Sequence, residues 1–404
     1  MKNILVILGT RPEAIKLAPV ILELQKNNNY NVLVCNTEQQ KELSNQTLGF
    51  FGIKTDFNLN VMTPNQTLAG VQSRIIEKLS DVYTHNQIDA TIIQGDTMTV
   101  LCGALVSFYN HIPVFHVEAG LRSYNLFEPF PEEAIRQMTS RIVDLHFAPT
   151  ITAKENLVKE NIPEDKIFLT GNTVIDALHC LKDDVVNNAI KKLEEKNIKL
   201  NDKLVLITVH RRENHGERLD SILSAIKNIA MNFADHQFVL PVHPNPNVHD
   251  KVYKTLKNMQ NIVLTDPLDY PELVCVMKNA KLILTDSGGI QEEAPTFNVP
   301  LLVIRNETER KEGVAVGLAK LIGTNKNRII DEVTAVLSKS KSETRINGIK
   351  NPYGDGKASR KISNIMDNFF NLVTINAENE QKHKENISIH NKTYIKCNNL
   401  KISS

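Results

Sequence analysis

The chain has 404 residues, of which 41% are hydrophobic and 23% are charged, and its formal net charge at pH 7 is +1. This composition predicts a soluble globular protein of two or three domains and gives no electrostatic reason to expect nucleic acid or a membrane surface as a partner. The apolar run at residues 4–8 is too short for a signal peptide, no stretch approaches the roughly 18 apolar residues that span a membrane, and the five cysteines are widely separated, which together favour a cytoplasmic protein with a small-molecule partner.

Short β-branched runs alternate with longer amphipathic patterns along the first half of the chain. Strands are expected at 3–8, 31–36, 89–93, 113–118 and 145–148. Helices are expected between and after them, with Pro12 and Pro131 in first helical turns, at 12–27, 39–50, 66–85, 97–109, 131–143 and 151–161. This alternation predicts a parallel sheet covered by helices.

The second half repeats the theme, which indicates two successive doubly wound α/β halves. Its strands are expected at 204–209, 237–242, 262–264, 282–285 and 300–304. A polar helical segment at 182–199 has few large apolar residues and is interpreted as the boundary between two domains.

These patterns predict four parts along the chain. The parts are an N-terminal domain at 1–175, a C-terminal domain at 176–356, a final helix at 357–372 that returns to the first domain, and a disordered polar tail at 375–404.

A glycine pair follows the apolar run at 282–284 and precedes a helical pattern. At such a strand-to-helix junction, Gly288 and Gly289 would expose backbone amides to an anion, and Ser287 could donate a further hydrogen bond. Glu293, one turn along, could hold sugar hydroxyls. The segment therefore predicts a diphosphate site, although the same tripeptide also occurs in tight connections that bind nothing.

Polar residues also follow three strands of the first half, where ligands of parallel sheets bind. Arg11 and Lys16 flank a helix start and could engage phosphate or sugar, or could be solvated cations. Asp96 is either a helix N-cap or a carboxylate that takes part in the chemistry of the site. Glu118 ends an apolar run, where a charge without a partner would be costly.

A third acidic element places Glu132 and Glu133 in a first helical turn, with Arg136 one turn later. First-turn acids are ordinarily partners of the helix dipole. If this element converges with Asp96 and Glu118, the crowded carboxylates would have spread pKa values that suit proton abstraction and return.

Two histidines follow strands of the second half. His210 could be a general acid or a hydrogen-bond donor, or could be structural, and Arg211 or Arg212 beside it could bind phosphate. His243 repeats the arrangement one strand later. The spacing of the histidines matches no standard metal site, so no metal is expected.

Together these motifs resemble those of the non-hydrolysing UDP-N-acetylglucosamine 2-epimerases, over about residues 2–372. The ordered set that carries the resemblance lies at 9–16, 116–122, 131–133, 210–214, 285–295, 309–310 and 351–356. The resemblance implies a GT-B type fold, which consists of two Rossmann-like doubly wound parallel-sheet domains with the active site in the interdomain cleft. It also implies a homodimer.

The implied reaction is the reversible conversion of UDP-N-acetylglucosamine to UDP-N-acetylmannosamine, a precursor of bacterial surface polysaccharides. A base removes the proton at sugar C2 while UDP leaves from C1, which forms 2-acetamidoglucal; UDP then adds back and the proton arrives on the opposite face. No cofactor is required.

The resemblance also implies roles for individual residues. Asp96, Glu118 and Glu132 are the acid–base candidates, with no choice among them for the carboxylate that takes the proton, and His210 is expected near the diphosphate or sugar. Residues expected to hold the substrate are Arg11, Ser287, Gly288, Gly289 and Arg310 at the phosphates, Glu293 at the ribose, and Lys16 and Arg136. Domain closure is expected during the cycle.

The chain departs from the family pattern where many bacterial relatives bind a second UDP-N-acetylglucosamine as an activator. Glu42 and Asn65 stand where an activated relative has glutamine and arginine, which predicts weakened or altered activation. The positions that match the effector site are Gln39, Glu132, Arg211 and His243.

Three other functions remain open at this stage. A hydrolysing relative would release UDP and free N-acetylmannosamine. A GT-B glycosyltransferase would need an acceptor cleft and has less use for three carboxylates. A catalytically inactive nucleotide-sugar sensor would keep the glycine cradle but would have lost the acids, which are present here.

Overall fold

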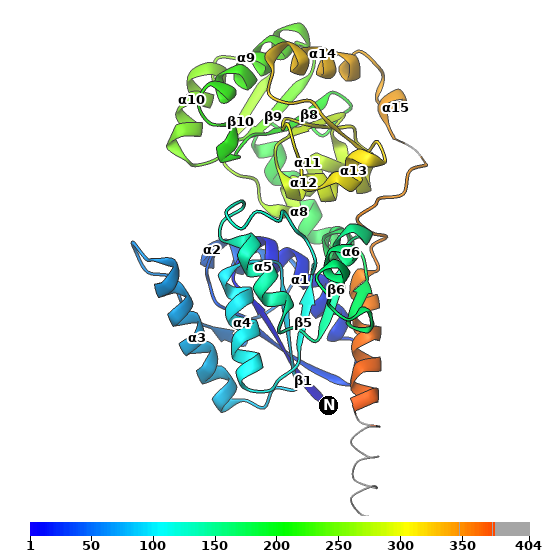
Figure 1. The fold of residues 1–404 in the computed structure, drawn as a ribbon. Helices are drawn as coiled ribbons and strands as arrows, with labels where there is room; N and C mark the ends of the chain where they lie inside the picture. The colour runs from blue at the N-terminus through cyan, green and yellow to red at the C-terminus, as the bar shows by residue number, and fades with distance from the viewer. Residues whose placement is uncertain (347, 374, 376–404) are drawn as a thin grey trace, which may run out of the picture. The chain divides into compact units, whose positions relative to one another are not determined.

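The computed structural model describes residues 1–346, 348–373 and 375. Residues 1–359 form one compact unit that contains two parallel β-sheets with their helices (Figure 1). The described residues after 359 belong to a second unit, and residues 360–373 continue a helix that begins at 358.

The first sheet has seven parallel strands in the order β3-β2-β1-β4-β5-β6-β7. Its strands are β1 (Lys2–Leu8), β2 (Tyr30–Asn36), β3 (Phe57–Asn58), β4 (Ala90–Gln94), β5 (Val114–Val117), β6 (Leu145–Ala148) and β7 (Ile167–Leu169). The helices of this domain are α1 (Arg11–Leu24), α2 (Lys41–Phe50), α3 (Leu68–His85), α4 (Met98–Tyr109), α5 (Glu132–Ser140), α6 (Ile151–Lys159) and α7 (Thr173–Cys180), with a 3₁₀ turn η1 (Glu164–Lys166).

The second sheet has six parallel strands in the order β10-β9-β8-β11-β12-β13. Its strands are β8 (Leu204–Thr208), β9 (Gln237–Pro241), β10 (Ile262–Thr265), β11 (Leu282–Thr285), β12 (Leu301–Val303) and β13 (Ala319–Leu321). The helices that follow the first domain are α8 (Asp183–Glu195), α9 (Glu217–Asn232), α10 (Pro246–Leu256), α11 (Tyr270–Asn279), α12 (Gly288–Glu293), α13 (Lys311–Ala315), α14 (Lys326–Leu337) and α15 (Lys341–Thr344), with 3₁₀ turns η2 (Arg212–Asn214) and η3 (Ala294–Phe297).

Both sheets reverse their strand order at one point, between β1 and β4 in the first and between β8 and β11 in the second. In open parallel sheets, ligands bind beyond the carboxyl ends of the strands at such a switch point. The expectation of two Rossmann-like doubly wound domains, as in the GT-B fold, is confirmed.

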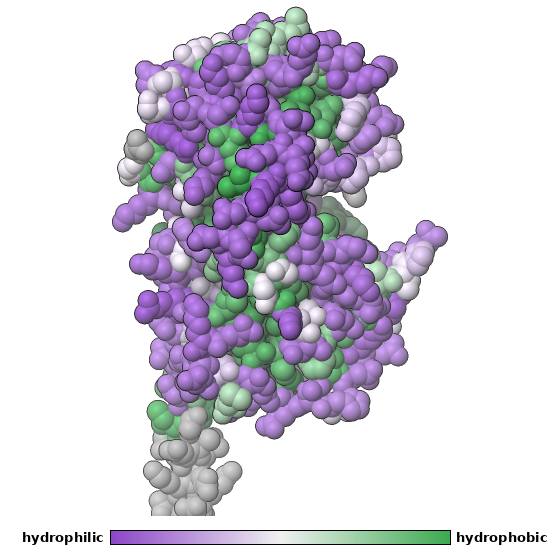
Figure 2. All heavy atoms as spheres, turned by 180° about the vertical axis from the view of Figure 1, so that it is seen from behind, coloured by the Kyte–Doolittle hydropathy of each residue, from purple (hydrophilic) through white to green (hydrophobic). Residues whose placement is uncertain are grey.

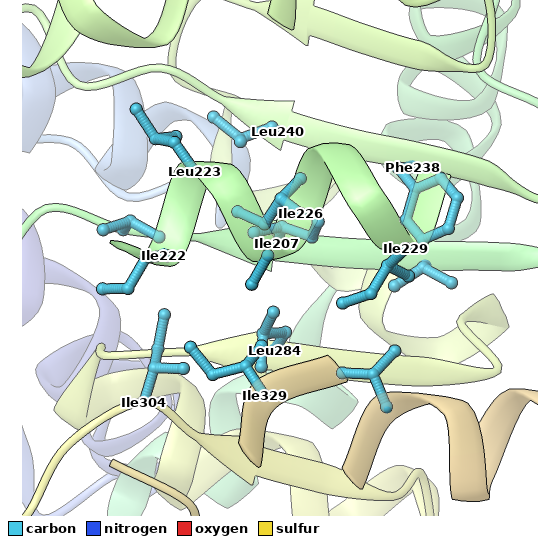
Figure 3. Packing of buried hydrophobic residues seen from close by; sticks show 14 of the residues in the cluster. Ile207, Ile222, Leu223, Ile226, Ile229, Phe238, Leu240, Leu284, Ile304 and Ile329 are labelled. Carbon is cyan, nitrogen blue, oxygen red and sulfur yellow. The ribbon is translucent and has the colours of Figure 1, made fainter. Parts of the chain in front are cut away.

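The core of the second domain shows why α9 is a helix in this position. Its apolar residues recur at Ile222, Ile226 and Ile229, a spacing of four and three residues that gives one buried face. Figure 3 shows this face packed against side chains from β8, β9, β11 and α14, namely Ile207, Phe238, Leu240, Leu284 and Ile329.

The surface seen in Figure 2 is mostly hydrophilic, with smaller hydrophobic areas between the polar residues. None of the helices in the described part of the chain is long and apolar enough to cross a membrane.

Several expected boundaries are wrong by a few residues. The strand expected at 113–118 ends at Val117, so Glu118 lies outside it, with a φ of 66° in the left-handed region. Pro131 caps α5 instead of lying in its first turn. The short strands β3, β7 and β13 are not among the expected ones, and the tail expected at 375–404 lies outside the described residues except for Ile375.

Candidate active site

A cavity of about 470 Å³ lies within residues 1–359, beyond the switch points of both sheets. This volume is in the range that small-molecule sites occupy. The polar residues that line it from the first domain include Thr10, Arg11, Glu13, Lys16, Asp96, Thr97 and Glu118. Those from the second domain include His210, His243, Tyr270, Ser287, Glu292, Glu293 and Arg310.

A charged network joins the two domains inside the cavity. Lys16 Nζ forms ion pairs with Glu118 Oε2 and, at 3.0 Å, with Glu292 Oε2. Arg310 Nε lies 3.0 Å from Glu292 Oε1. The Asn172 amide donates to Glu118 Oε2 at 3.1 Å and to Glu292 Oε2 at 3.2 Å. All of these side chains are buried or nearly so, which makes their charges interact strongly.

The two carboxylates of this network have opposite pKa shifts. Burial raises the pKa of Glu118, and the neighbouring Glu292 charge adds to that effect while Lys16 opposes it. Burial would also raise the pKa of Glu292, but Lys16 and Arg310 together lower it below its usual value. The two shifts point in opposite directions, so Glu118 is the carboxyl of the pair that holds a proton more readily.

The backbone at Glu118 is strained. A φ of 66° is uncommon for a residue with a side chain, and such conformations persist where the surroundings enforce them. The next residue, Ala119, donates its amide to the Phe147 carbonyl at 3.1 Å. At Gly120, which also has positive φ, an added Cβ would meet the Ala153 carbonyl oxygen at 2.2 Å. The chain is thus held close to α6, and Glu118 is directed toward the cavity.

Asp96 lies two residues after β4 and is held by a side chain of α5. Arg136 Nη1 is 2.6 Å from Asp96 Oδ2, and Arg136 Nη2 is 3.0 Å from Glu133. Burial would raise the pKa of Glu133, but the Ser123 amide and other donors lower it. Arg136 therefore acts through Asp96 and does not line the cavity itself.

Glu132 is the acidic candidate that the structure does not bring to the cavity. It is half-buried in the first turn of α5 and is not among the lining residues. Of the three carboxylates expected to converge, Asp96 and Glu118 line the same cavity.

Glu13 was not among the expected site residues, yet it is buried in the cavity wall. Its carboxylate accepts from the Gly9 amide at 2.6 Å, the Thr10 amide at 2.9 Å and the Thr97 hydroxyl at 2.5 Å. Burial raises the pKa of Glu13 to about 7, although these hydrogen bonds lower it. The side chain thus ties the loop after β1 to the loop after β4.

His210 is positioned by Asp286, a second residue that was not expected. Asp286 accepts from the His210 amide at 3.0 Å and the Arg211 amide at 2.9 Å, and its Oδ1 lies 3.1 Å from His210 Nδ1. Burial would raise the pKa of Asp286, but its contacts with His210 lower it. The His243 ring stacks beside His210, with ring centroids 6.2 Å apart.

The glycine segment after β11 forms a cationic pocket wall. Ser287 is the N-cap of α12, and Gly288 begins the helix. A Cβ at Gly288 would lie 3.1 Å from Arg310 Cζ and 3.2 Å from Arg211 Nη2. The absence of a side chain therefore allows two guanidinium groups to lie close to Gly288, and two such positive charges attract anions.

Glu293 lies at the far end of α12 beside Tyr270. Burial raises the pKa of Glu293 to about 7, and a contact with Tyr270 lowers it. Arg11 reaches the same region from the first domain and donates to the Leu268 carbonyl at 3.2 Å. Burial lowers the pKa of Arg11, although Glu293 opposes that shift.

The expected effector positions are only partly brought together. His243 lines the cavity, whereas Gln39 does not line it and accepts from the Thr99 hydroxyl at 3.0 Å. Arg211 Nη2 lies 3.6 Å from Glu309. Glu42 and Asn65 are exposed on α2 and on a loop.

Among the residues that the structure describes, no group of three or more His, Cys, Asp or Glu side chains is arranged to hold a metal ion.

A family model described as UDP-N-acetylglucosamine 2-epimerase matches residues 22–367. The chain is 46% identical over 363 residues to the UDP-N-acetylglucosamine 2-epimerase of Neisseria meningitidis, a match that covers 89% of this chain and 98% of that protein. It is 44% identical over 370 residues to that of Yersinia pestis, covering 91% and 98%.

Solved structures show the same similarity. The crystal structure of the Neisseria meningitidis UDP-GlcNAc 2-epimerase bound to UDP-GlcNAc has a TM-score of 0.83 at 46% identity, covering 91% of this chain and 99% of that chain. The Methanocaldococcus jannaschii UDP-GlcNAc 2-epimerase in complex with UDP-GlcNAc and UDP has a TM-score of 0.76 at 35% identity, covering 90% and 99%. The likeness therefore extends over both sheets.

Proposed function

The chain belongs to the UDP-N-acetylglucosamine 2-epimerase family, and from that premise we propose that it interconverts UDP-N-acetylglucosamine and UDP-N-acetylmannosamine by inverting C2 of the sugar. One observation carries the proposal. A single cavity has Asp96 and Glu118 on the wall from the first domain and Ser287 and Arg310 on the wall from the second. In this proposal, acid–base groups from the first domain would face a diphosphate site formed by the second.

The proposed mechanism is an elimination followed by an addition, without hydrolysis. A carboxylate takes the proton from C2 while the C1–O bond to UDP breaks, which leaves 2-acetamidoglucal and UDP. UDP then re-forms the bond to C1 as a proton is delivered to the opposite face of C2. Inversion needs proton-transfer groups on two faces, and Glu118 and Asp96 are the candidates that line the cavity. Glu132 would join them only if α5 moved.

The second domain would bind and release the diphosphate. Arg310, Ser287 and the amides of Gly288 and Gly289 would stabilise the negative charge that develops as UDP departs. Arg11 would reach the phosphates from the first domain. Glu293 would accept the ribose hydroxyls, His210 would donate near the diphosphate, and Lys16 and Arg136 would steady the reacting sugar through their carboxylate partners.

The family likeness supports further proposals about the whole protein. We propose a cytoplasmic homodimer that supplies surface polysaccharide synthesis, with domains at 1–175 and 176–356 and with the final helix, 357–372, assigned to the first domain. The acid Glu42 and the amide Asn65, where an activated relative has glutamine and arginine, support weakened activation by a second UDP-N-acetylglucosamine, because they bind a diphosphate less well. A strongly sigmoidal rate curve that only effector-site mutations abolish would contradict the last proposal.

Proton NMR of the purified protein with UDP-N-acetylglucosamine in deuterated water tests the function. We expect deuterium at C2 and accumulation of UDP-N-acetylmannosamine. Free N-acetylmannosamine with UDP would instead identify a hydrolysing enzyme. Absence of C2 exchange would favour a transferase or a nucleotide-sugar sensor.

A further inference from the structure

Two carboxylates from different domains share the same two donors. Lys16 Nζ and Asn172 Nδ2 each contact Glu118 Oε2 and Glu292 Oε2. Glu118 directly follows β5, and Glu292 lies on α12. The family reaction assigns a role to Glu118, whereas nothing in the mechanism above uses Glu292 or Asn172.

The Asn172 amide has only one orientation available to it. Its Oδ1 accepts from the Val174 amide at 3.1 Å, because Asn172 is the N-cap of α7. Its own backbone amide donates to the Tyr353 carbonyl at 2.7 Å. With the oxygen and the backbone both committed, Nδ2 must point at the two carboxylates. Asn172 is 3% exposed, so water does not offer an alternative partner.

Glu292 is fixed from its other side. Arg310 Nε holds Oε1 at 3.0 Å, so Oε2 is left to Lys16 and Asn172. Both recorded partners of the Glu118 side chain lie at Oε2. The other oxygen, Oε1, has no partner among the described residues, and Glu118 lines the cavity. The network thus binds one oxygen of Glu118 and leaves one for a substrate.

Glu292 also limits how far Lys16 can neutralise Glu118. If Lys16 had Glu118 as its sole anionic partner, it would stabilise the ionised carboxylate and weaken it as a base. The charges that face the pair are Lys16, Arg310 and each other, with Glu293 and the Tyr353 hydroxyl beside Glu292. Because Lys16 is shared with Glu292, Glu118 has a higher proton affinity than it would have with Lys16 to itself.

We propose that Glu292 and Asn172 are positioning residues, which hold Glu118 with one oxygen free and share its lysine so that it can exchange the C2 proton. This inference rests on the proposed function. Because Glu292 belongs to the diphosphate-binding domain, the proton-transfer group in the first domain is set correctly only when the two domains are in contact.

Two substitutions separate orientation from charge. Glu292→Gln removes the charge and keeps the shape, and we expect kcat for C2 exchange to fall by up to about 100-fold. The limb of the kcat–pH profile that reports Glu118 should move to lower pH, because a like charge is lost. Asn172→Ser keeps a good N-cap but cannot reach the carboxylates. It should lower kcat and move that limb to higher pH, opposite to Glu292→Gln, because a donor to the ionised Glu118 is lost. UDP binding, measured by calorimetry, should not weaken in Glu292→Gln, because Arg310 is released from one partner.

Glu272→Gln is the matched control. Glu272 is also a buried carboxylate of the second domain that pairs with a lysine, Lys196, at 2.6 Å, but it does not line the cavity. It should leave the pH profile unchanged. If wild type exchanges C2 and Glu292→Gln keeps the wild-type kcat and pH profile, the positioning role is wrong. If wild type itself does not exchange C2, the proposed function is wrong.

Discussion

Arg136 Nη1 lies 2.6 Å from Asp96 Oδ2, while the same guanidinium is 3.0 Å from Glu133. The arginine therefore connects α5 to the end of β4 and fixes the side chain that borders the cavity. A planar guanidinium makes both contacts from one position, which a lysine cannot do. Asp96 is thus placed by a residue that does not line the cavity.

Arg136→Lys should lower kcat by about 10-fold to 100-fold, because displacing Asp96, which we propose transfers a proton, by about 1 Å would have an effect of that size. UDP affinity should stay within about threefold of the wild-type value, because the residues proposed to bind the diphosphate are unchanged. Arg141→Lys, at the exposed end of the same helix, where Arg141 donates to the Glu160 carbonyl at 2.8 Å, serves as the control. Equal kcat values for the two variants would contradict this placement of Asp96.

Glu13 should make the free energy of unfolding depend on pH. Burial raises the pKa of Glu13 in the folded protein to about 7, from an ordinary value of 4.5. Below pH 4.5 the carboxyl is protonated in both states. Between pH 4.5 and 7 the unfolded chain loses the proton first, so stability falls as the pH rises. The total loss of stability across this pH range is about 3 kcal/mol, because each unit of pKa difference between the two states corresponds to about 1.36 kcal/mol.

Glu13→Gln should remove this contribution, and chemical denaturation at several pH values between 4.5 and 7.5 would measure it. The stability of the variant should fall less steeply with pH than that of wild type. Glu293, whose pKa burial also raises to about 7, contributes a similar slope to both proteins, so the difference between them is the quantity to compare. Parallel curves would show that Glu13 ionises normally.

Several residues of the cavity can be predicted from the sequence, because parallel strands all end at the same edge of a sheet. Residues directly after parallel strands meet at one edge of a sheet, so Asp96, Glu118, His210 and Ser287 could be selected from the pattern alone. Glu132 could not be judged in this way, because it follows a loop of irregular backbone instead of a strand. Whether a first helical turn reaches a cavity depends on that loop.

Two important carboxylates were missed for different reasons. Glu13 stands three residues after Thr10, the spacing of a capping box, and this local signal could have identified its contacts with backbone amides. Glu292 lies beside Glu293 on a short helix, and only the tertiary packing of α12, which contacts α7, decides which of the two faces Lys16. That choice is tertiary and has no sequence signature.

Ile226→Ala tests the core of the second domain. Ile226 is 1% exposed and lies within the cluster of Figure 3, so the substitution should lower the free energy of unfolding by about 2–5 kcal/mol. Met231→Ala on the same helix, where Met231 is 64% exposed, should change it by less than about 0.5 kcal/mol. Denaturant titration of both variants would measure the difference, and similar midpoints would contradict the assignment of this face to the core.

Asp286→Asn should weaken the contacts that hold the His210 side chain in position. The carboxylate accepts from two backbone amides and the Asn214 amide, and it lies against the His210 ring. The new side-chain amide would point an N–H at one of these N–H donors, so two buried donors would face each other without an acceptor. We expect kcat to fall by about 100-fold or less, with a lower unfolding midpoint.

The control for Asp286 is another Asp–His pair of the same domain. Asp235 Oδ1 lies 2.8 Å from His236 Nδ1, but its side chain is 60% exposed. Asp235→Asn should leave kcat unchanged, because solvent can replace the lost contact. If Asp286→Asn also left kcat unchanged, His210 would not depend on Asp286 for its position.

Gly288→Ala should reduce affinity for UDP more than it reduces stability. The new Cβ would lie 3.1 Å from Arg310 Cζ and 3.2 Å from Arg211 Nη2, which is tighter than ordinary contact, so both guanidinium groups must shift away from the new methyl group. Each charge-assisted hydrogen bond is worth about 1.5–3 kcal/mol, and the loss of one would weaken UDP binding by about 10-fold to 100-fold. Gly49→Ala, where no atom lies within 4 Å of the new Cβ, should bind UDP normally. Calorimetry with UDP alone measures the effect without turnover, and unchanged affinity in Gly288→Ala would mean that the diphosphate does not lie on this wall.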